Sequence, residues 1–328
     1  YSDYRMFKST GKAHMFQKYI CSRMYDHINW NTIPGKALLG LVSGKFLANH
    51  SLKDSYISWL KTQPTVKFNG YPFELARKIY RNASLETTIT VDKQFDGLIE
   101  TASKDGVFKG NVLCGLDTSS SMTWTTLDNS GTMPYHVCLS LGIYFSELNK
   151  GAFHNVVADF NDRCTLRTLS GTFSEKWNYL THNCQGWGST NFQGLVDLVV
   201  DTRKKHPKIP LEDFPTTLLV VSDMQFNPAG SNRLTNYEVA MNKLRAVFPE
   251  KFVDDFKIVW WYCTNRNTND VPATMDKGGQ YLVSGFDGSI INLILNKKVD
   301  EKTGEVRSLT MEESVEAALN QEVLTLVQ

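Results

Sequence analysis

The sequence has few of the features that identify several large classes of protein. Its six cysteines are scattered and show no Cys-x-x-Cys spacing, so they are interpreted as small buried residues in a reducing compartment. No apolar run is long enough to span a membrane, and no signal peptide is recognisable. The histidines show no metal-ligand spacing, and no Gly-x-x-x-x-Gly-Lys phosphate loop is present. We therefore expect a cytoplasmic, intracellular protein that does not bind a membrane.

A strong net charge is also missing, because 35 Lys and Arg face 34 Asp and Glu. The charge is nevertheless uneven along the chain. Residues 1–100 contain 14 basic and 8 acidic side chains, which leaves 21 and 26 for the remainder. Ordinary solubility is the simpler interpretation, and a basic surface for RNA phosphates is the alternative.

With 328 residues and 41% hydrophobic content, the chain can build one large domain or two ordinary ones. It opens at Tyr1 without Met, so we expect a piece of a longer protein. The periodicity predicts a helical region over 1–107, the end of a longer helical domain, and alternating strands and helices over 108–297. A tail over 298–328 contains a polar stretch followed by a helix.

Several helices and links are predicted within the first region. Lys36 to Ala48 has the apolar spacing of one helix, and Ser51 is placed to cap the next one. The β-branched residues Thr87 to Val91 predict a short strand or an extended link. Alternation of strands and helices in the second region predicts an α/β fold with a mostly parallel, doubly wound sheet.

The chain is organised around residues 111–122, which read Asn-Val-Leu-Cys-Gly-Leu-Asp-Thr-Ser-Ser-Ser-Met. A short, unbroken apolar run predicts a strand buried on both faces, and the residues after it lie where open α/β sheets bind ligands. The side chains of Asp117, Ser119 and Ser121 offer only oxygen atoms to a metal ion. Oxygen ligands favour Mg²⁺, Mn²⁺ or Ca²⁺ over zinc or copper.

Two later stretches have a similar form. Residues 186–192, Gly-Trp-Gly-Ser-Thr-Asn-Phe, are a glycine-rich loop before a helix, and residues 218–225, Leu-Leu-Val-Val-Ser-Asp-Met-Gln, are a second apolar run that ends in an acid. Together with Asp-x-Ser-x-Ser at 117–121, they resemble the metal-ion-dependent adhesion site (MIDAS) of von Willebrand factor A (vWA) domains. The resemblance implies a Rossmann-like vWA fold over 108–297.

The resemblance also implies a role for each of five residues. Ser119 and Ser121 would bind the ion directly, and Thr190 would bind it directly or through water. Asp117 and Asp223 would act through water, which leaves a coordination position for an acidic side chain of a partner. Mg²⁺ fits best because it retains waters and takes few protein ligands.

Each of these residues also has a structural interpretation. Ser119 and Ser121 could cap the following segment, Thr190 could be only a helix N-cap, and Asp223 could be a turn residue. Trp187 and Asn191 are candidates for the rim of the ligand site, although a packed loop tryptophan is equally compatible with the sequence. Asp159, Asn161 and Asp162 could lie near the site, but a solvated turn is the preferred interpretation.

A helical region before a vWA part resembles the Ro/TROVE arrangement, in which a helical ring binds RNA. It also resembles a family of uncharacterised proteins of plants, fungi and viruses. The second resemblance rests on residues 33–39 (Ile-Pro-Gly-Lys-Ala-Leu-Leu), 221–224 (Val-Ser-Asp-Met) and 284–286 (Ser-Gly-Phe).

Two functions are carried forward. The first is a non-enzymatic, metal-dependent module that binds a protein partner offering Asp or Glu. The alternative is a Ro-like RNA-binding protein that uses the basic helical region. An enzyme is not expected, because no base is visible near Asp117 or Ser121.

Overall fold

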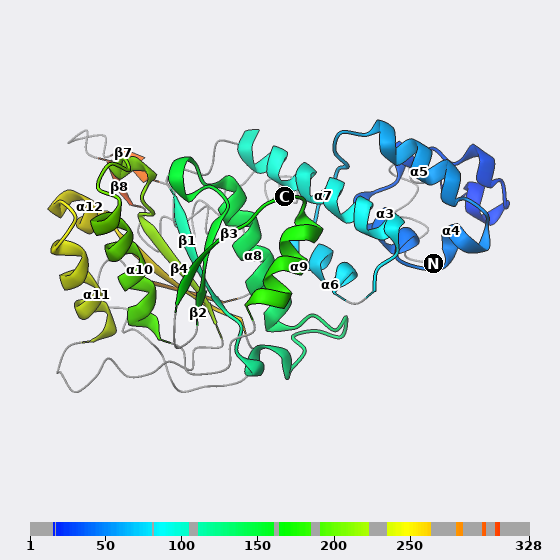
Figure 1. Cartoon of the computed structure of the whole chain (residues 1–328). Coiled ribbons are helices and arrows are strands. Elements are labelled where there is room, and N and C mark those ends of the chain that lie inside the picture. The colour runs from blue at the N-terminus through cyan, green and yellow to red at the C-terminus, as the bar shows by residue number, and fades with distance from the viewer. Residues whose placement is uncertain are drawn as a thin grey trace, which may run out of the picture. The chain divides into compact units, whose positions relative to one another are not determined.

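The computed structural model of the protein describes residues 16, 18–80, 82–104, 111–160, 164–184, 191–222, 235–263, 280–284, 297–299 and 306–308. The chain divides into two compact units. Residues 1–101 and 172–174 form the first, here called the helical unit, and the remaining residues form the second, here called the sheet unit. Figure 1 shows the elements of both.

The helical unit is built from short helices around an aromatic core. Trp30, Leu38, Tyr56 and Leu60 are buried at its centre, and the rings of Trp30 and Tyr56 meet edge to face with centroids 5.0 Å apart. Its elements are η1 (Tyr25–His27), η2 (Trp30–Thr32), α3 (Gly35–Val42), α4 (Phe46–Asn49), α5 (Lys53–Thr62), α6 (Pro72–Ile79) and α7 (Leu85–Lys104).

Three local predictions for the helical unit are wrong. The predicted helix from Lys36 to Ala48 is two helices, α3 and α4, separated by a turn that contains Gly44. Ser51 does not cap α5, because it has a positive φ of 56° and Leu52 occupies the N-cap position.

The predicted strand or link from Thr87 to Val91 lies inside α7. The hydroxyl of Thr90 donates to the carbonyl of Glu86 at 2.6 Å and is 2.7 Å from the hydroxyl of Tyr56. A threonine that bonds the preceding turn is compatible with a helix, so these local contacts override the β preference of the residue.

The sheet unit contains six strands in the order β3-β2-β1-β4-β5-β6. All neighbours are parallel except β2 and β3, which are antiparallel. This is the doubly wound order, and it confirms the predicted α/β fold class with a mostly parallel sheet after a helical region. The strands are β1 (Val112–Asp117), β2 (Val156–Phe160), β3 (Thr165–Thr168), β4 (Thr217–Ser222), β5 (Lys257–Tyr262) and β6 (Gln280–Ser284).

Helices cover both faces of this sheet. A Cβ at Gly115 of β1 would lie 2.5 Å from Leu195, whereas a Cβ at Gly142 would lie 2.4 Å from Leu116 of β1. Because successive strand residues point to opposite faces, the helices of Leu195 and Gly142 pack on opposite faces. The helices of the unit are η3 (Ser120–Thr123), α8 (Pro134–Leu148), η4 (Gly151–Phe153), α9 (Phe173–Asn183), α10 (Phe192–Lys205), η5 (Leu211–Asp213), α11 (Asn236–Arg245) and α12 (Glu250–Asp254).

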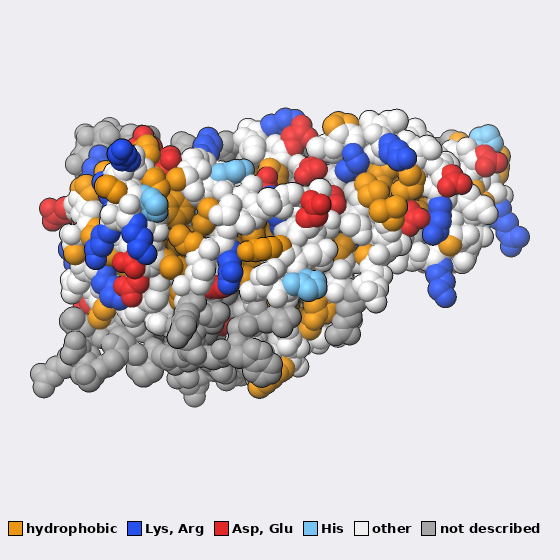
Figure 2. All heavy atoms as spheres, in the orientation of Figure 1, with side chains coloured by type: hydrophobic (Ala, Val, Ile, Leu, Met, Phe, Trp, Pro, Cys, Tyr) orange, Lys and Arg blue, Asp and Glu red, His pale blue; other side chains and the backbone are white. Residues whose placement is uncertain are grey.

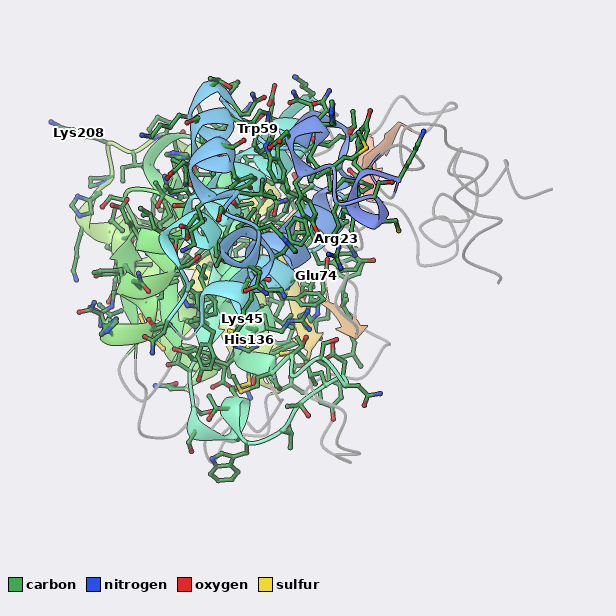
Figure 3. All side chains as sticks on the ribbon, turned by 90° about the vertical axis from the view of Figure 1, so that its right-hand side faces the viewer. Arg23, Lys45, Trp59, Glu74, His136 and Lys208 are labelled. Carbon is green, nitrogen blue, oxygen red and sulfur yellow. The ribbon has the colours of Figure 1, made fainter. Side chains whose placement is uncertain are left out.

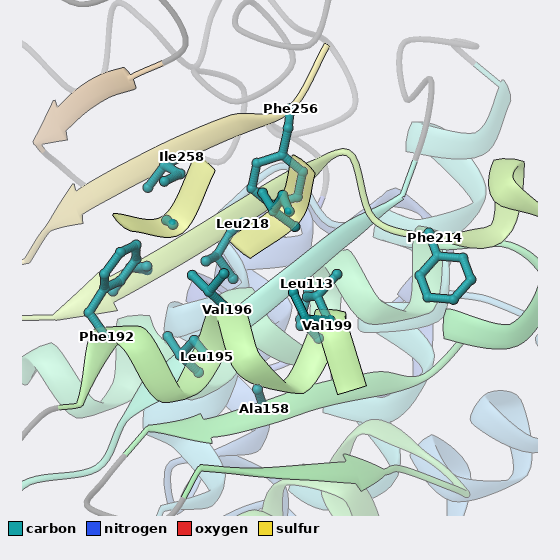
Figure 4. Packing of buried hydrophobic residues seen from close by; sticks show 14 of the residues in the cluster. Leu113, Ala158, Phe192, Leu195, Val196, Val199, Phe214, Leu218, Phe256 and Ile258 are labelled. Carbon is teal, nitrogen blue, oxygen red and sulfur yellow. The ribbon is translucent and has the colours of Figure 1, made fainter. Parts of the chain in front are cut away.

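A large apolar core lies between the sheet and α10. Phe192, Leu195, Val196 and Val199 of α10 face apolar side chains of four strands (Figure 4). Their spacing is typical of an amphipathic helix that packs one face on a core. The core fixes α10 against the strands, and it therefore fixes the position of the amino-terminus of α10 at the edge of the sheet.

The carboxy-terminal tail differs from its prediction in one respect. Its polar stretch contains a two-stranded antiparallel sheet of β7 (Lys297–Val299) and β8 (Val306–Ser308). The helix predicted after this polar stretch, over residues 311–326, lies outside the described residues. Among the described helices, none combines the length and apolar character needed to cross a membrane.

The Thr90–Tyr56 contact gives a test of this core. Burial raises the pKa of Tyr56 to about 12, and the hydroxyl lies in a fully buried side chain. We expect Thr90→Val to lower the free energy of unfolding by about 1–3 kcal/mol, because the Tyr56 hydroxyl would lose its buried partner. Urea unfolding followed by circular dichroism measures the change.

Thr88→Val is the matched control on the same helix. Thr88 also bonds the preceding turn, through the carbonyl of Ser84 at 3.1 Å, but its side chain is only half-buried. We expect Thr88→Val to lower the free energy of unfolding by no more than about 0.5 kcal/mol, as for most surface substitutions. Equal losses for the two variants would contradict the role assigned to Thr90.

Candidate metal site

The candidate site lies where two neighbouring parallel strands end. β1 and β4 pair through Leu116 and Val221, so Asp117 and Ser222, the last residues of these strands, end side by side. In the observed strand order the direction of winding reverses between β1 and β4. Doubly wound sheets bind ligands at this switch point, outside the carboxyl ends of the strands.

Asp117 is held from two sides. Its side chain is fully buried. Oδ1 accepts a hydrogen bond from the backbone N–H of Ser119 at 2.9 Å, and Oδ2 accepts one from the hydroxyl of Ser222 at 2.6 Å. Hydrogen bonds to a charged acceptor are stronger than neutral ones, so these contacts stabilise the buried carboxylate and fix its orientation.

The turn after β1 brings two hydroxyls together. The Oγ atoms of Ser119 and Ser121 are 3.0 Å apart, on half-buried side chains, whereas Ser120 between them is exposed. The turn is anchored by Met122, whose side chain is fully buried and whose N–H donates to the carbonyl of Ser119 at 3.1 Å. The alternating pattern of Asp-x-Ser-x-Ser therefore places both hydroxyls beside Asp117.

The spacing of the hydroxyls fits a small divalent cation. Two adjacent ligands of an octahedral Mg²⁺, each about 2.1 Å from the ion, are about 3.0 Å apart. The Ser119 and Ser121 oxygens have this separation, which is also a normal distance for a hydrogen bond between them. Within the described residues, no group of three or more His, Cys, Asp or Glu is placed to hold a metal.

A buried cysteine joins the two strands behind the site. The thiol of Cys138 on α8 is 3.4 Å from the carbonyl of Asp117 and 3.4 Å from that of Val221, and it donates to them. Burial, together with the nearby Cys263 thiol and Asp117 carboxylate, raises the pKa of Cys138 well above its usual value. The thiol is therefore a neutral donor and does not compete as a thiolate ligand.

Sequence reasoning missed Cys138 and Ser222 as parts of the site. Cys138 was interpreted only as a small apolar residue of a helix, because nothing in its neighbourhood indicates a link to two strands. Ser222 had a visible signal, since it directly precedes Asp223 at the end of an apolar run.

The structure describes only some of the predicted site residues. It brings Asp117, Ser119 and Ser121 together, while Thr190, Asp223 and Trp187 lie outside the described residues. Their roles therefore stay predictions.

Asn191 is the N-cap of α10, and its Oδ1 accepts the N–H of Gly194 at 3.1 Å. The helix cap suggested for Thr190 is therefore at the following residue. An asparagine satisfies the free N–H groups of a first turn well.

Asp159 is not part of a solvated turn. It is buried, accepts the N–H of Thr165 at 2.7 Å, and pairs with the guanidinium of Arg167 at 2.8 Å. Asp159 lies beside Leu116 in the register, whereas Asp117 lies beside Phe160. Because paired residues of parallel strands share a face, the carboxylates of Asp159 and Asp117 belong to opposite faces of the sheet.

Comparison with known proteins places the sheet unit in a family. Residues 111–325 match the family described as a domain of unknown function, DUF7788. The chain belongs to this family. The DUF7788 match begins at the first residue of the stretch that forms the candidate site and contains all five predicted metal residues.

The uncharacterized protein L728 of Acanthamoeba polyphaga mimivirus is 24% identical over 313 residues, which cover 89% of this chain and 52% of the viral protein. The chain thus spans about half the length of that curated relative. The crystal structure of the Deinococcus radiodurans Ro (RSR) protein superimposes with a TM-score of 0.47 and 15% identity, over 80% of this chain and 52% of that one. DUF7788 membership and the viral relative agree with the predicted resemblance to a family of uncharacterised proteins.

The anchoring of Asp117 is testable by stability. We expect Ser222→Ala to lower the free energy of unfolding by about 1.5–3 kcal/mol, because a buried carboxylate loses a hydrogen bond. Ser140→Ala is the control, since Ser140 is equally buried and donates to the neutral carbonyl of Val137 at 3.2 Å. Urea unfolding compares the two variants, and a smaller loss for Ser222→Ala would contradict the anchoring role.

Proposed function

We propose that the chain is a non-enzymatic protein-interaction module that binds an acidic side chain of a partner through a divalent cation, with Mg²⁺ as the preferred ion. The observation that carries this proposal is the pair of hydroxyl oxygens of Ser119 and Ser121, 3.0 Å apart over the fixed carboxylate of Asp117. The pair lies at the switch point of a doubly wound sheet, which is the usual place for a ligand.

Five side chains would hold the ion. Ser119 and Ser121 would bind it directly, Thr190 directly or through water, and Asp117 and Asp223 through water. A bound ion would supply a positive charge with an open coordination position for a carboxylate. Ser119 and Ser121 would offer neutral hydroxyls to the ion, which would leave most of its positive charge available to an acidic partner.

The contacts of the serines support binding rather than catalysis. A serine nucleophile needs a base within hydrogen-bonding reach. In the described part of the chain, the hydrogen bond made by each of the Ser119 and Ser121 hydroxyls is to the other hydroxyl. The thiol of Cys138 faces backbone carbonyls and is held protonated by burial, so it is not an activated nucleophile either.

Calorimetric titration with Mg²⁺ tests the proposal. We expect Ser119→Ala to reduce Mg²⁺ affinity at least about tenfold, because one direct ligand is lost. Asp117→Asn should have a similar effect, since it removes the charge behind the ion and keeps the shape of a buried side chain.

Ser120→Ala is the matched control in the same turn. The Ser120 side chain is exposed, and the described contact of the residue is its carbonyl, which accepts from Thr123 at 2.8 Å. Mg²⁺ affinity should therefore stay within about twofold of the parent value. Identical titrations for the parent and Ser119→Ala proteins would refute the proposal.

A second candidate is RNA binding by the helical unit. The surplus of basic residues over 1–100 favours it, and exposed side chains such as Arg23 and Lys45 contribute to that surplus (Figure 3). The face shown in Figure 2 does not favour it, because basic and acidic side chains are interspersed there. Lys36 and Lys53 are already paired with Glu74 and Glu86. We therefore rank RNA second.

Salt dependence separates this candidate from the first. If the helical unit binds RNA, the affinity for a single-stranded RNA should fall linearly with salt on a double-logarithmic plot. Lys45→Gln should reduce the slope by about 0.7, the contribution of one phosphate contact. Lys208→Gln, on the sheet unit, is the control and should leave the slope unchanged. Undetectable RNA binding at low salt would eliminate the candidate.

A further inference from the structure

Trp124 is an exposed aromatic side chain beside the candidate site. It is 67% exposed, whereas Trp30, Trp177, Trp260 and Trp261 are buried. The indole of the half-buried Trp59 donates to Asn31 at 3.1 Å. Folding thus covers the other tryptophans of the described chain wholly or in part and leaves this one in solvent. Exposed tryptophans are frequent anchors of protein interfaces, because one ring supplies a large apolar contact at little entropic cost.

The turn that carries Trp124 is joined directly to the two serines. The N–H of Trp124 donates to the carbonyl of Ser121 at 3.2 Å. Three residues of a 3₁₀ turn, at about 2 Å each, separate the positions of Ser121 and Trp124 by about 6 Å. A ligand held at the serine hydroxyls therefore lies one 3₁₀ turn from the backbone position that carries the exposed indole.

The loop after Trp124 is held in shape by hydrogen bonds. Oδ1 of Asp128 accepts the N–H groups of Ser130 and Thr132 at 2.9 and 3.0 Å, and Oδ2 accepts the hydroxyl of Thr132 at 2.8 Å. The N–H of Leu127 donates to the carbonyl of Thr132 at 2.7 Å, which closes the loop. The loop that follows Trp124 is therefore preorganised, and a preorganised surface lowers the entropic cost of binding.

The charges of this segment indicate the chemistry of the partner. The sequence contains no Lys or Arg between Lys109 and Lys150, so the turn offers no cation to a phosphate backbone. The acid in the loop, Asp128, already accepts three hydrogen bonds, which makes it a poor partner for an incoming cation. An apolar side chain is the group that an exposed indole binds best in such surroundings.

We propose that Trp124 is a second anchor for the partner, and that it binds a large apolar side chain two residues away from the acid that the ion binds. The separation of about 6 Å is close to that of side chains i and i+2 on one face of an extended segment. The partner is therefore an extended protein segment with Asp or Glu, any residue, and then an aliphatic or aromatic residue, in either chain direction. This inference rests on the proposed function, because the ion places the acid.

Selection of short random peptides on phage against the full chain, with Mg²⁺ present, tests the inference. The expected peptides carry an acid and an apolar residue two positions apart. With Trp124→Ala as the target, the acid should be retained and the preference at the apolar position lost. With Ser119→Ala, both preferences should disappear.

The affinity of a selected peptide supplies the magnitude. We expect Trp124→Ala to weaken peptide binding about 10- to 100-fold, as for an aromatic anchor, with Mg²⁺ affinity unchanged. Trp124→Phe should retain most of the binding. Leu85→Ala is the control, because Leu85 is an equally exposed apolar residue, at 69%, on the helical unit.

The outcomes separate the two proposals. Three results would each overturn the second anchor without affecting the proposed ion site. They are selected peptides with an acid but no preferred residue two positions away, peptides with a basic residue in place of the apolar one, and peptides that bind the Trp124→Ala protein as well as the parent. Peptides that lack an acid and bind in the presence of a chelator would overturn both.

Discussion

The carboxylate of Asp117 is the group on which the arrangement of the site depends. It ends a fully buried strand, so its charge must be compensated where water does not reach. Two elements meet this requirement: the turn of Ser119 provides an N–H, and β4 provides the Ser222 hydroxyl. The Cys138 thiol of α8 donates to the backbone carbonyl of Asp117 and holds the end of the strand. The contacts that stabilise the acid are therefore also the contacts that join β1, β4 and the serine turn.

Much of this fold could be predicted from the sequence. The apolar runs before Asp117 and Asp223 predicted buried parallel strands, and the alternation of strands and helices predicted a doubly wound sheet, because both patterns follow from local periodicity. Asp117, Ser119 and Ser121 could be predicted as one group, since they are close in the chain and a strand end fixes their direction.

The contacts that could not be predicted join residues far apart in the chain. Ser222 meets Asp117 across 105 positions, and Cys138 meets Val221 across 83. Neither contact produces a periodic pattern in the sequence. The wrong prediction of a strand or link over Thr87 to Val91 has a related cause. This β-branched stretch lies in a helix, where Thr90 contacts Tyr56 of another helix. The local helix or strand preference of a residue predicted its structure poorly wherever a buried polar atom bonds a residue far away in the chain.

Gly115 has a consequence for how the site can change. A methyl group in place of its hydrogen would lie 2.5 Å from Leu195 of α10, the helix whose first turn begins at Asn191. Any larger residue at 115 would push α10, together with its N-cap Asn191, away from β1. Substitutions at positions 115 and 195 should therefore occur in pairs, with gain of volume at one matched by loss at the other.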